Sequence, residues 1–379
     1  MIRQSPSRRT FLKTSTLALA LGSPRRILGA NDAVRLGIIG TGGRGQRLLK
    51  AITNIPAYRV AAVCDLIEDR AKQAAVICEE YRPRVKVYTD FSQMLRREKL
   101  DACLVATEEA NHAKCVIPVL ESGLSCFSEK PMDITVERVD AVTRAARNAK
   151  GIYQIGFQRR YVPSFQKCIA HLHEGHMGRI TFFQGMWQWS SGISGRYLDM
   201  DLAGGWFLAQ ACHHADVITW VMDGPPVRCV AMGAVTVKYE NPPLHCAEDH
   251  SGLLFEFPGH VTCSYTHLMN CCEAFTGEKL WVFAEKGGID LRTGIKYPMP
   301  DAGEPETIGR ESPDWDEGTY EELEAFARHI RNHEKPLANV EIGRISTLMG
   351  IMWGMAMYNR EAREFEPCII NWEDLGTST

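Results

Sequence analysis

A glycine-rich turn near the amino terminus constrains the fold of this 379-residue chain more than any other feature. It follows the apolar stretch 34–39, precedes a segment with apolar residues at helical spacing, and is followed twenty residues later by an acid, Asp65. Glycines at such positions permit a tight turn and let the backbone approach a pyrophosphate, which then lies at the positive end of the helix. The pattern predicts a dinucleotide site, with an ordinary strand–turn–helix as the alternative. The residues of the turn are Gly40, Thr41, Gly42, Gly43, Arg44 and Gly45.

The acid at the end of the second expected strand, 59–64, indicates which nucleotide the site takes. A carboxylate in this place accepts hydrogen bonds from the adenosine ribose hydroxyls and would repel a 2′-phosphate. Asp65 therefore favours NAD as the cofactor. Arg70 lies close enough in sequence to keep NADP open.

Residues 1–30 have the features of an export signal that is removed from the folded protein. A twin arginine, Arg8-Arg9, precedes a short apolar run at 17–21, and 28–30 can serve as a cleavage site. The run is shorter than the roughly 20 residues that span a bilayer, so no stable membrane anchor is expected. We expect recognition by the twin-arginine export machinery and a periplasmic or otherwise exported protein. A disordered basic terminus or a short helix is the alternative.

Charge and cysteine content narrow the class of protein. Removal of residues 1–30 takes six basic and no acidic residues and changes the net charge from −3 to −9, which argues against nucleic acid as a partner. The 13 cysteines form no C-x-x-C pair, and several lie in apolar stretches, as small core residues do. Cys271-Cys272 has no assignment. The cysteines expected in the core are Cys64, Cys103, Cys115, Cys126, Cys229 and Cys263.

The hydrophobic pattern predicts two domains. Strand and helix signals alternate from 34 to 150, which is typical of a parallel, doubly wound sheet. Beyond 156, long strand signals are separated by short turns, which favours a mostly antiparallel sheet. We expect a surface loop over 294–318 and two amphipathic helices that close the chain. The expected strands of this second sheet are 179–189, 227–238, 251–257, 261–267 and 280–284.

An ordered set of short motifs adds a family resemblance. After the glycine turn come Ala106-Thr107, Glu129-Lys130-Pro131, the sequence GFQRRY at 156–161, and Gly204-Gly205 ahead of His213-x-x-Asp216. This order resembles the Gfo/Idh/MocA oxidoreductases, the family of glucose–fructose oxidoreductase and inositol dehydrogenase. The resemblance implies an α/β protein. After the expected signal peptide at 1–30, it implies an NAD(P)-binding Rossmann domain at 31–155 and an α+β domain with an open, mostly antiparallel sheet at 156–379. It also implies a homo-oligomer, a dimer or tetramer, and oxidation or reduction of a sugar, polyol or similar carbinol.

The resemblance assigns catalysis to Lys130 and His213. A lysine buried beside an oxidised nicotinamide should have a depressed pKa and relay the hydroxyl proton. A histidine that titrates near neutral pH is the natural proton acceptor. We expect Glu129 to orient Lys130, and His214 to point elsewhere. The alternatives are a solvated surface lysine and a histidine satisfied within the core.

Further residues are expected to contact the cofactor and the substrate. Cofactor contacts beyond the turn and Asp65 are expected from Thr107, His112, Glu129 and Lys130, and substrate contacts from Arg159, Tyr161 and Tyr197. No metal site is expected, since His171 and His173 do not share a helix face.

Two departures from the family pattern bear on the chemistry. The acid that precedes the family's histidine by four residues falls on Ala209, where a helical i, i+4 pair would have placed carboxylate beside imidazole. The family's Pro-Asn after Ala106-Thr107 is replaced by Glu108-Glu109, two acids that could favour a polyhydroxylated or cationic substrate.

Export also limits the mechanism. No free NAD(P) pool exists outside the cytoplasm, so the cofactor should be tightly bound and regenerated on the enzyme. The first hypothesis is an exported sugar or polyol oxidoreductase. The second is a glycosidase-type hydrolase or lyase that works by transient oxidation and elimination. The third is a nucleotide-binding protein without turnover, which the missing acid at Ala209 keeps open.

Overall fold

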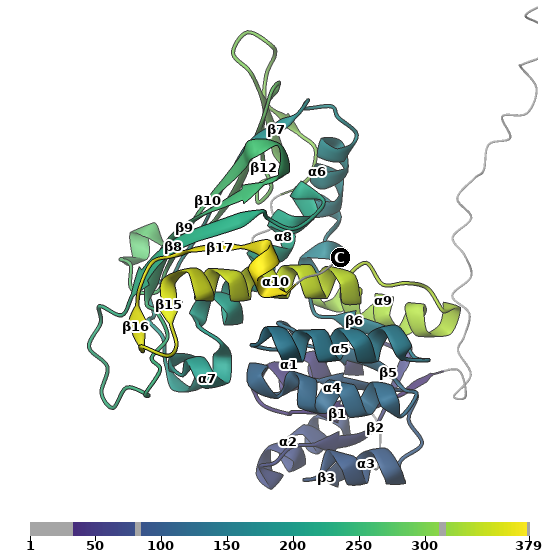
Figure 1. The fold of residues 1–379 in the computed structure, drawn as a ribbon. Coiled ribbons are helices and arrows are strands. Elements are labelled where there is room, and N and C mark those ends of the chain that lie inside the picture. Colours follow the sequence, from purple (N-terminus) through teal and green to yellow (C-terminus); the bar gives the residue numbers. More distant parts are fainter. Residues whose placement is uncertain (1–32, 80–84, 311–315, 377–379) are drawn as a thin grey trace, which may run out of the picture.

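The computed structural model describes residues 33–79, 85–310 and 316–376, so the expected export signal lies outside the described residues. Two domains meet along the long helix α10 (Val340–Met357), with the amino-terminal domain below it and a large sheet above it in Figure 1.

The amino-terminal domain is the predicted parallel sheet with helices on both faces. The strand order β3-β2-β1-β4-β5-β6 reverses direction between β1 and β4, and the carboxyl ends of these two strands form the crevice in which such folds bind ligands. The strands are β1 (Val34–Ile39), β2 (Tyr58–Cys64), β3 (Lys86–Tyr88), β4 (Ala102–Val105), β5 (Ser125–Ser128) and β6 (Tyr153–Ile155). The helices are α1 (Gly43–Thr53), α2 (Glu68–Glu79), α3 (Phe91–Arg97), α4 (His112–Glu121) and α5 (Val136–Asn148).

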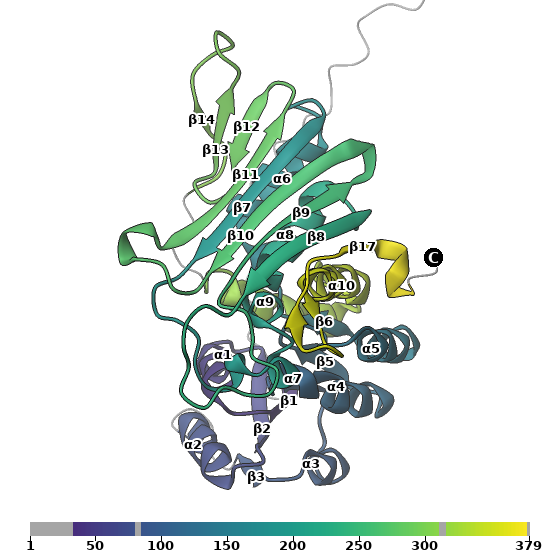
Figure 2. The same ribbon diagram turned by 60° about the vertical axis from the view of Figure 1, so that its left-hand side comes forward.

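The second sheet is mostly antiparallel, as predicted. Its order is β14-β13-β12-β11-β7-β10-β9-β8-β17, and β7 with β10 is the parallel pair. Helices α6 (Pro163–His173), α8 (Cys212–Met222) and α10 lie behind it, while the described residues leave its other face without a helix (Figure 2). The strands are β7 (Ile180–Gln188), β8 (Arg228–Ala234), β9 (His250–Phe257), β10 (Val261–Leu268), β11 (Gly277–Ala284), β12 (Gly287–Asp290), β13 (Ile295–Pro298), β14 (Glu306–Thr307) and β17 (Ile369–Asn371).

Two sequence predictions about the carboxyl-terminal part were wrong. The expected surface loop over 294–318 contains β13 and β14, which extend one edge of the sheet. The chain also does not close on two helices. After α10 it forms β15 (Tyr358–Asn359), β16 (Glu364–Phe365) and then β17, which pairs with β8 at the other edge. These strands contain two to four residues, too few to show an alternation of apolar and polar side chains in the sequence. They form because they pair with a neighbouring strand.

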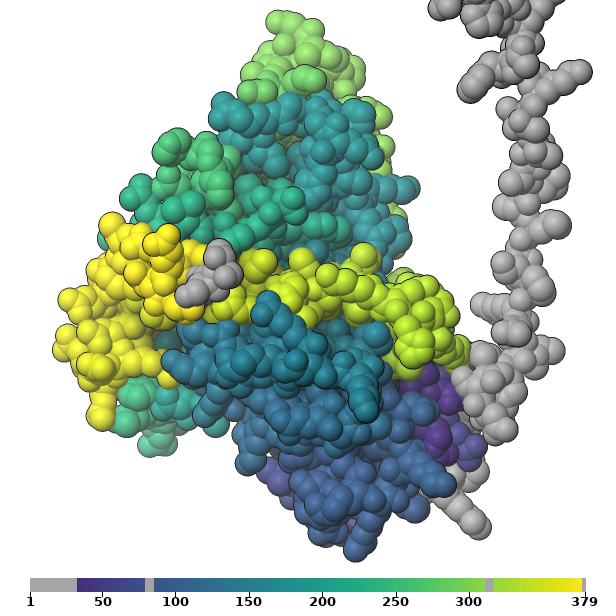
Figure 3. Space-filling view, turned by 45° about the vertical axis from the view of Figure 1, so that its right-hand side comes forward, coloured from purple at the N-terminus to yellow at the C-terminus, as the bar shows by residue number. Residues whose placement is uncertain are grey.

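Helices α9 (Thr319–Asn332) and α10 bind the two domains into one body, seen as the yellow-green band in Figure 3. Leu323 of α9 is buried in the same apolar cluster as Leu36 of β1, and its carbonyl accepts a 2.6 Å hydrogen bond from the Tyr58 hydroxyl. Met349 and Met352 of α10 are fully buried core residues, whereas Met355 is exposed.

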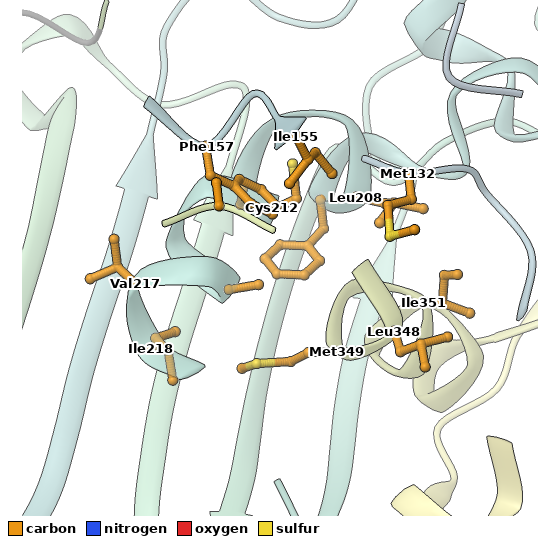
Figure 4. Close-up of a cluster of buried hydrophobic side chains, with 14 of the residues drawn as sticks. Met132, Ile155, Phe157, Leu208, Cys212, Val217, Ile218, Leu348, Met349 and Ile351 are labelled. Atoms are coloured by element: carbon orange, nitrogen blue, oxygen red, sulfur yellow. The ribbon is translucent and has the colours of Figure 1, made fainter. Parts of the chain in front are cut away.

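The apolar cluster in Figure 4 crosses the domain boundary. Met132 and Ile155 come from the first domain, whereas Leu208, Cys212 and Leu348 come from the second. Because side chains of both domains share this core, the crevice of the Rossmann sheet is held against the start of α8.

The cysteines expected in the core are all buried there. Every cysteine is a free thiol, and Cys272 and Cys368 are exposed. Within residues 33–79, 85–310 and 316–376, no helix is long and apolar enough to cross a membrane.

Candidate active site

The glycine turn divides into positions that the fold requires and positions that it leaves open. Gly40 has φ +86°, and a Cβ there would lie 2.6 Å from the backbone of Ala106. A Cβ on Gly45 would lie 2.1 Å from the carbonyl oxygen of Gly40. A Cβ on Gly42 or Gly43 would meet nothing within 4 Å. The turn is therefore closely packed at both ends and open at the amino terminus of α1, where a nucleotide pyrophosphate fits.

Asp65 lies beside this opening. Its Oδ2 accepts hydrogen bonds from the backbone N–H of Thr41 at 2.8 Å and from the Thr41 hydroxyl at 3.2 Å. Its Oδ1 accepts one from the N–H of Ile67 at 2.9 Å. The carboxylate predicted to contact the ribose is thus held at the edge of the turn.

Arg44, predicted among the cofactor contacts, is held by acids of the protein. Its Nε lies 2.7 Å from Glu129, and its Nη1 lies 2.6 Å from Asp316, just ahead of α9. Arg44 therefore ties the glycine turn to the Glu129-Lys130-Pro131 segment and to the second domain. The other oxygen of Glu129 accepts from the backbone N–H of Lys130 at 3.3 Å, so Glu129 positions the lysine through its main chain.

His112 has a similar bridging position. Its Nδ1 lies 2.6 Å from the carbonyl of Pro131, and its Nε2 lies 3.3 Å from the carbonyl of Thr107. The Thr107 hydroxyl donates to the carbonyl of Glu108 at 3.3 Å. The buried imidazole thereby joins the end of β4 to the cis Lys130–Pro131 turn and fixes the lysine at the mouth of the crevice.

Lys130 reaches the place where the family's acid is missing. Its ammonium donates a 2.7 Å hydrogen bond to the backbone carbonyl of Ala209. Ala209 belongs to a π-helical turn, η4 (Phe207–Ala211), directly ahead of α8, and such turns recur at functional sites. A main-chain carbonyl thus takes the place of a side-chain carboxylate as the partner of Lys130.

The protein's own groups shift the pKa of Lys130 upward, whereas the expected depression depends on the positive charge of a nicotinamide. Burial lowers the pKa of Lys130, but Cys212, Glu129, Tyr197 and Glu109 together raise it above its usual value. These groups favour the ammonium form of Lys130, which can stabilise negative charge.

His213 is the complementary group. Its side chain is buried, its Nδ1 has no hydrogen-bond partner, and its ring meets Phe157 edge-on at 6.3 Å. Burial first, then the cations Lys130 and Arg159, lower the pKa of His213 well below its usual value. The predicted titration near neutral pH was therefore wrong, and the imidazole is neutral and able to accept a proton.

His214 points away from the crevice, as expected, into a buried polar network. Its Nδ1 shares a hydrogen bond with the Tyr265 hydroxyl, and its Nε2 lies 3.0 Å from Glu278. Glu278 also accepts a 2.6 Å hydrogen bond from Nη2 of Arg159. Burial lowers the pKa of His214 to about 4, while Arg159 and His214 hold that of Glu278 far below its usual range against its own burial. Sequence reasoning missed Glu278 and Tyr265, since they lie on strands distant in sequence.

The three expected substrate contacts lie in different surroundings. Arg159 is buried, with its Nη1 lacking a partner. Tyr161 is buried beside His329, and its hydroxyl accepts from the N–H of Ala338, so the structure packs it against the link from α9 to α10. Tyr197 packs against Trp206 at 4.8 Å and is close enough to Lys130 to raise its pKa.

The two acids near the cofactor crevice also have partners within the chain. Glu109 is buried and forms an ion pair with Arg196, whose Nη2 donates to the Tyr197 hydroxyl at 2.9 Å. Glu108 accepts from the side chain of Asn111 at 3.3 Å. Glu109 therefore orders the loop that carries Tyr197.

Comparison with known proteins agrees with this geometry. The profile of the oxidoreductase family with an NAD-binding Rossmann fold, GFO_IDH_MocA, matches residues 34–157, and that of the GFO/IDH/MocA C-terminal domain matches residues 165–290. The chain belongs to the Gfo/Idh/MocA family. Its first domain is accordingly an NAD-binding domain, and the chain is an oxidoreductase of this family.

Individual members of the Gfo/Idh/MocA family are similar at low identity. Inositol 2-dehydrogenase of Salmonella typhimurium is 25% identical over 257 residues, covering 65% of this chain and 72% of that protein. Among solved structures, levoglucosan dehydrogenase in complex with NADH and levoglucosan has a TM-score of 0.76 at 16% identity, covering 89% of this chain and 99% of the other. A probable dehydrogenase from Thermotoga maritima has a TM-score of 0.72 at 21% identity, covering 90% and 100%.

Proposed function

We propose that this protein is an NAD-dependent dehydrogenase that oxidises or reduces a carbinol of a sugar or polyol. The observation that carries the proposal is a neutral, buried imidazole with an unpartnered nitrogen, His213, beside the ammonium of Lys130 at the mouth of the Rossmann crevice. Proton acceptor and positive charge are the two groups that hydride loss from a carbinol requires.

In the proposed mechanism His213 takes the hydroxyl proton. Lys130, steadied by the carbonyl of Ala209, stabilises the developing alkoxide by charge and hydrogen bonding. Bound at the glycine turn and Asp65, NAD would supply the hydride acceptor for the carbinol carbon. The open space over Gly42 and Gly43 and the fixed carboxylate of Asp65 suit a dinucleotide.

Export through the twin-arginine pathway, tight retention of NAD and a periplasmic location are part of the proposal. They are supported by the twin arginine at 8–9 and by the many free thiols, which suit folding in a reducing compartment before export. A protein exported after folding can carry its nucleotide with it.

We also propose a homo-oligomer formed through the helix-free face of the large sheet. Ile369, Val230 and Leu254 lie side by side on β17, β8 and β9, and both Ile369 and Leu254 are exposed. Met232 on β8 and Phe283 on β11 are further exposed apolar side chains of the same sheet. Exposed apolar side chains gathered on one face, as on β17, β8 and β9, mark an association site.

One observation keeps other reaction types in view. Lys130 contacts a carbonyl at position 209, which cannot exchange a proton as a carboxylate would. The same pair could therefore serve a glycosidase-type cycle of transient oxidation and elimination, or the protein could hold nucleotide without turnover.

The test begins with purification and an absorbance spectrum, which reports bound NAD(H). The protein is then incubated with a panel of free sugars, polyols and aryl glycosides. Substrate oxidation without aglycone release supports the dehydrogenase, and aglycone release without net NADH supports the glycosidase-type cycle. Bound nucleotide with no turnover on any compound overturns both in favour of simple nucleotide binding.

A further inference from the structure

We propose that Arg159 binds a carboxylate of the substrate, so that the sugar or polyol acted on at Lys130 and His213 is a sugar acid. The inference rests on the proposed function and names the substrate class of the same site. It starts from a buried guanidinium group that the protein satisfies only in part.

Arg159 is held in place and has hydrogen-bond donors that the protein does not use. Only 3% of its surface is exposed, and its guanidinium lies 5.3 Å from the centre of the Trp187 ring. Nη2 donates to Glu278 at 2.6 Å, whereas Nη1 is buried without a partner. A buried, charged N–H group without an acceptor is costly, and a planar guanidinium matches the geometry of a carboxylate.

Arg159, which carries the unpartnered nitrogen, lies between this buried network and the catalytic region. Arg159 and His214 bind the same oxygen of Glu278, and His214 directly follows His213. Phe157, two residues before Arg159, contacts the His213 ring. Arg159 is also among the cations that lower the pKa of His213, which agrees with this proximity.

The protein's own carboxylates in this region are already engaged. Glu278 is shared by Arg159 and His214, Glu129 is paired with Arg44, and Glu109 is paired with Arg196. The hydrogen bond of the Lys130 ammonium goes to an uncharged carbonyl. An incoming carboxylate would therefore gain from Arg159 and Lys130, while a cationic substrate would be repelled. This reverses the preference that Glu108-Glu109 indicated in the sequence.

The test compares binding of matched pairs that differ in one group. The holoprotein is titrated with glucuronate against glucose, galacturonate against galactose, mannuronate against mannose, and gluconate against sorbitol, followed by calorimetry. We expect one acid or more to bind at least about tenfold tighter than its neutral partner. If no acid binds more tightly than its partner, the proposal is overturned.

Variants assign the effect to Arg159. In Arg159→Met the affinity for the acid should fall to that of the neutral partner, and Arg159→Lys should retain part of the preference. Because Arg159→Met leaves Glu278 buried without its main partner, the double variant Arg159→Met/Glu278→Gln provides a charge-balanced version, with folding checked by circular dichroism. Arg179→Met, which removes a surface pair with Glu285, is the matched control and should change nothing. An acid preference that survives in every folded Arg159 variant contradicts the proposal.

The binding readout separates this inference from the proposed function. Preferential acid binding without turnover would leave the inference standing and refute the dehydrogenase. Turnover of neutral sugars alone, with no acid bound more tightly, would support the dehydrogenase and refute the inference about Arg159.

Discussion

The glycine turn offers a sharp test, because the structure separates glycines that the protein needs from glycines that a ligand needs. Gly42, the amino-terminal cap of α1, has φ −67°, which alanine adopts readily, and its Cβ would meet nothing within 4 Å. As a helix cap, alanine is less favourable than glycine by about 0.5 kcal/mol. Against this, alanine lowers the conformational entropy of the unfolded chain, which stabilises the folded protein by about 0.4–1 kcal/mol. Gly42→Ala should therefore change the free energy of unfolding by less than about 0.5 kcal/mol.

Gly45→Ala is the matched contrast. Its Cβ would lie 2.1 Å from the carbonyl oxygen of Gly40, a contact with main chain that cannot swing aside. We expect a loss of about 1–3 kcal/mol of stability, as for other overpacked positions. Affinity for NAD should fall in both variants, by about tenfold or more in Gly42→Ala, because the new methyl group occupies the space open to the pyrophosphate.

The assay is urea unfolding of nucleotide-free protein together with NAD titration by calorimetry. Normal stability with weakened NAD binding in Gly42→Ala, against lost stability in Gly45→Ala, is the expected pattern. If Gly42→Ala binds NAD as the native protein does, the turn does not approach the pyrophosphate. If Gly42→Ala is as unstable as Gly45→Ala, the space beside Gly42 is too small for a methyl group and the reasoning is refuted.

Three further predictions concern charge. Lys130→Met should lower kcat by about 100-fold or more while NAD remains bound by absorbance; full activity would show that the lysine does not touch the reacting oxygen. Because the pKa of His213 is lowered well below 6.5, kcat/KM should stay level as the pH falls from about 8 to about 6, and a midpoint near 6.5 would contradict the assigned base. Burial raises the pKa of Glu248 from 4.5 to about 7, so the proton is held more tightly in the folded state. The protonated Glu248 contributes its full stabilisation below about pH 4.5, and about 3 kcal/mol of stability is lost as the pH rises through about 7. Glu248→Gln should flatten this pH dependence of stability in thermal melts.

Much of the fold was readable from sequence because its signals are local. The apolar run at 34–39, the glycine turn and the alternation of strands with helices predicted the Rossmann domain, and β1 has the predicted bounds. Regular alternation likewise predicted β7, β9 and β10 to within a residue or so. The strands that were missed, such as β14 and β17, contain two or three residues and depend on a neighbouring strand for their form.

The sequence pointed to the residues of the candidate site but not to their electrostatics. The motifs identified Lys130 and His213, yet their pKa values depend on groups far away in sequence. Cys212 reaches Lys130 only through the packing of α8 against the crevice, and burial of His213 follows from the same contact. Glu109 reaches Lys130 because β4 and β5, which precede the two residues, lie side by side in the sheet. Distances between such groups are set by tertiary structure, and a pKa changes steeply with distance and burial.

The NAD-binding domain and its glycine turn are thus what the sequence by itself determined, because residue type and spacing are enough to predict a dinucleotide crevice. The catalytic roles of Lys130 and His213 stay a prediction from the same motifs. The tertiary structure alone decided that a π-helical carbonyl at Ala209 replaces the missing acid and that His213 is neutral. It also decided that Arg159 keeps a buried nitrogen without a hydrogen-bond partner. Partners and burial are properties of packed side chains, which a linear pattern does not contain.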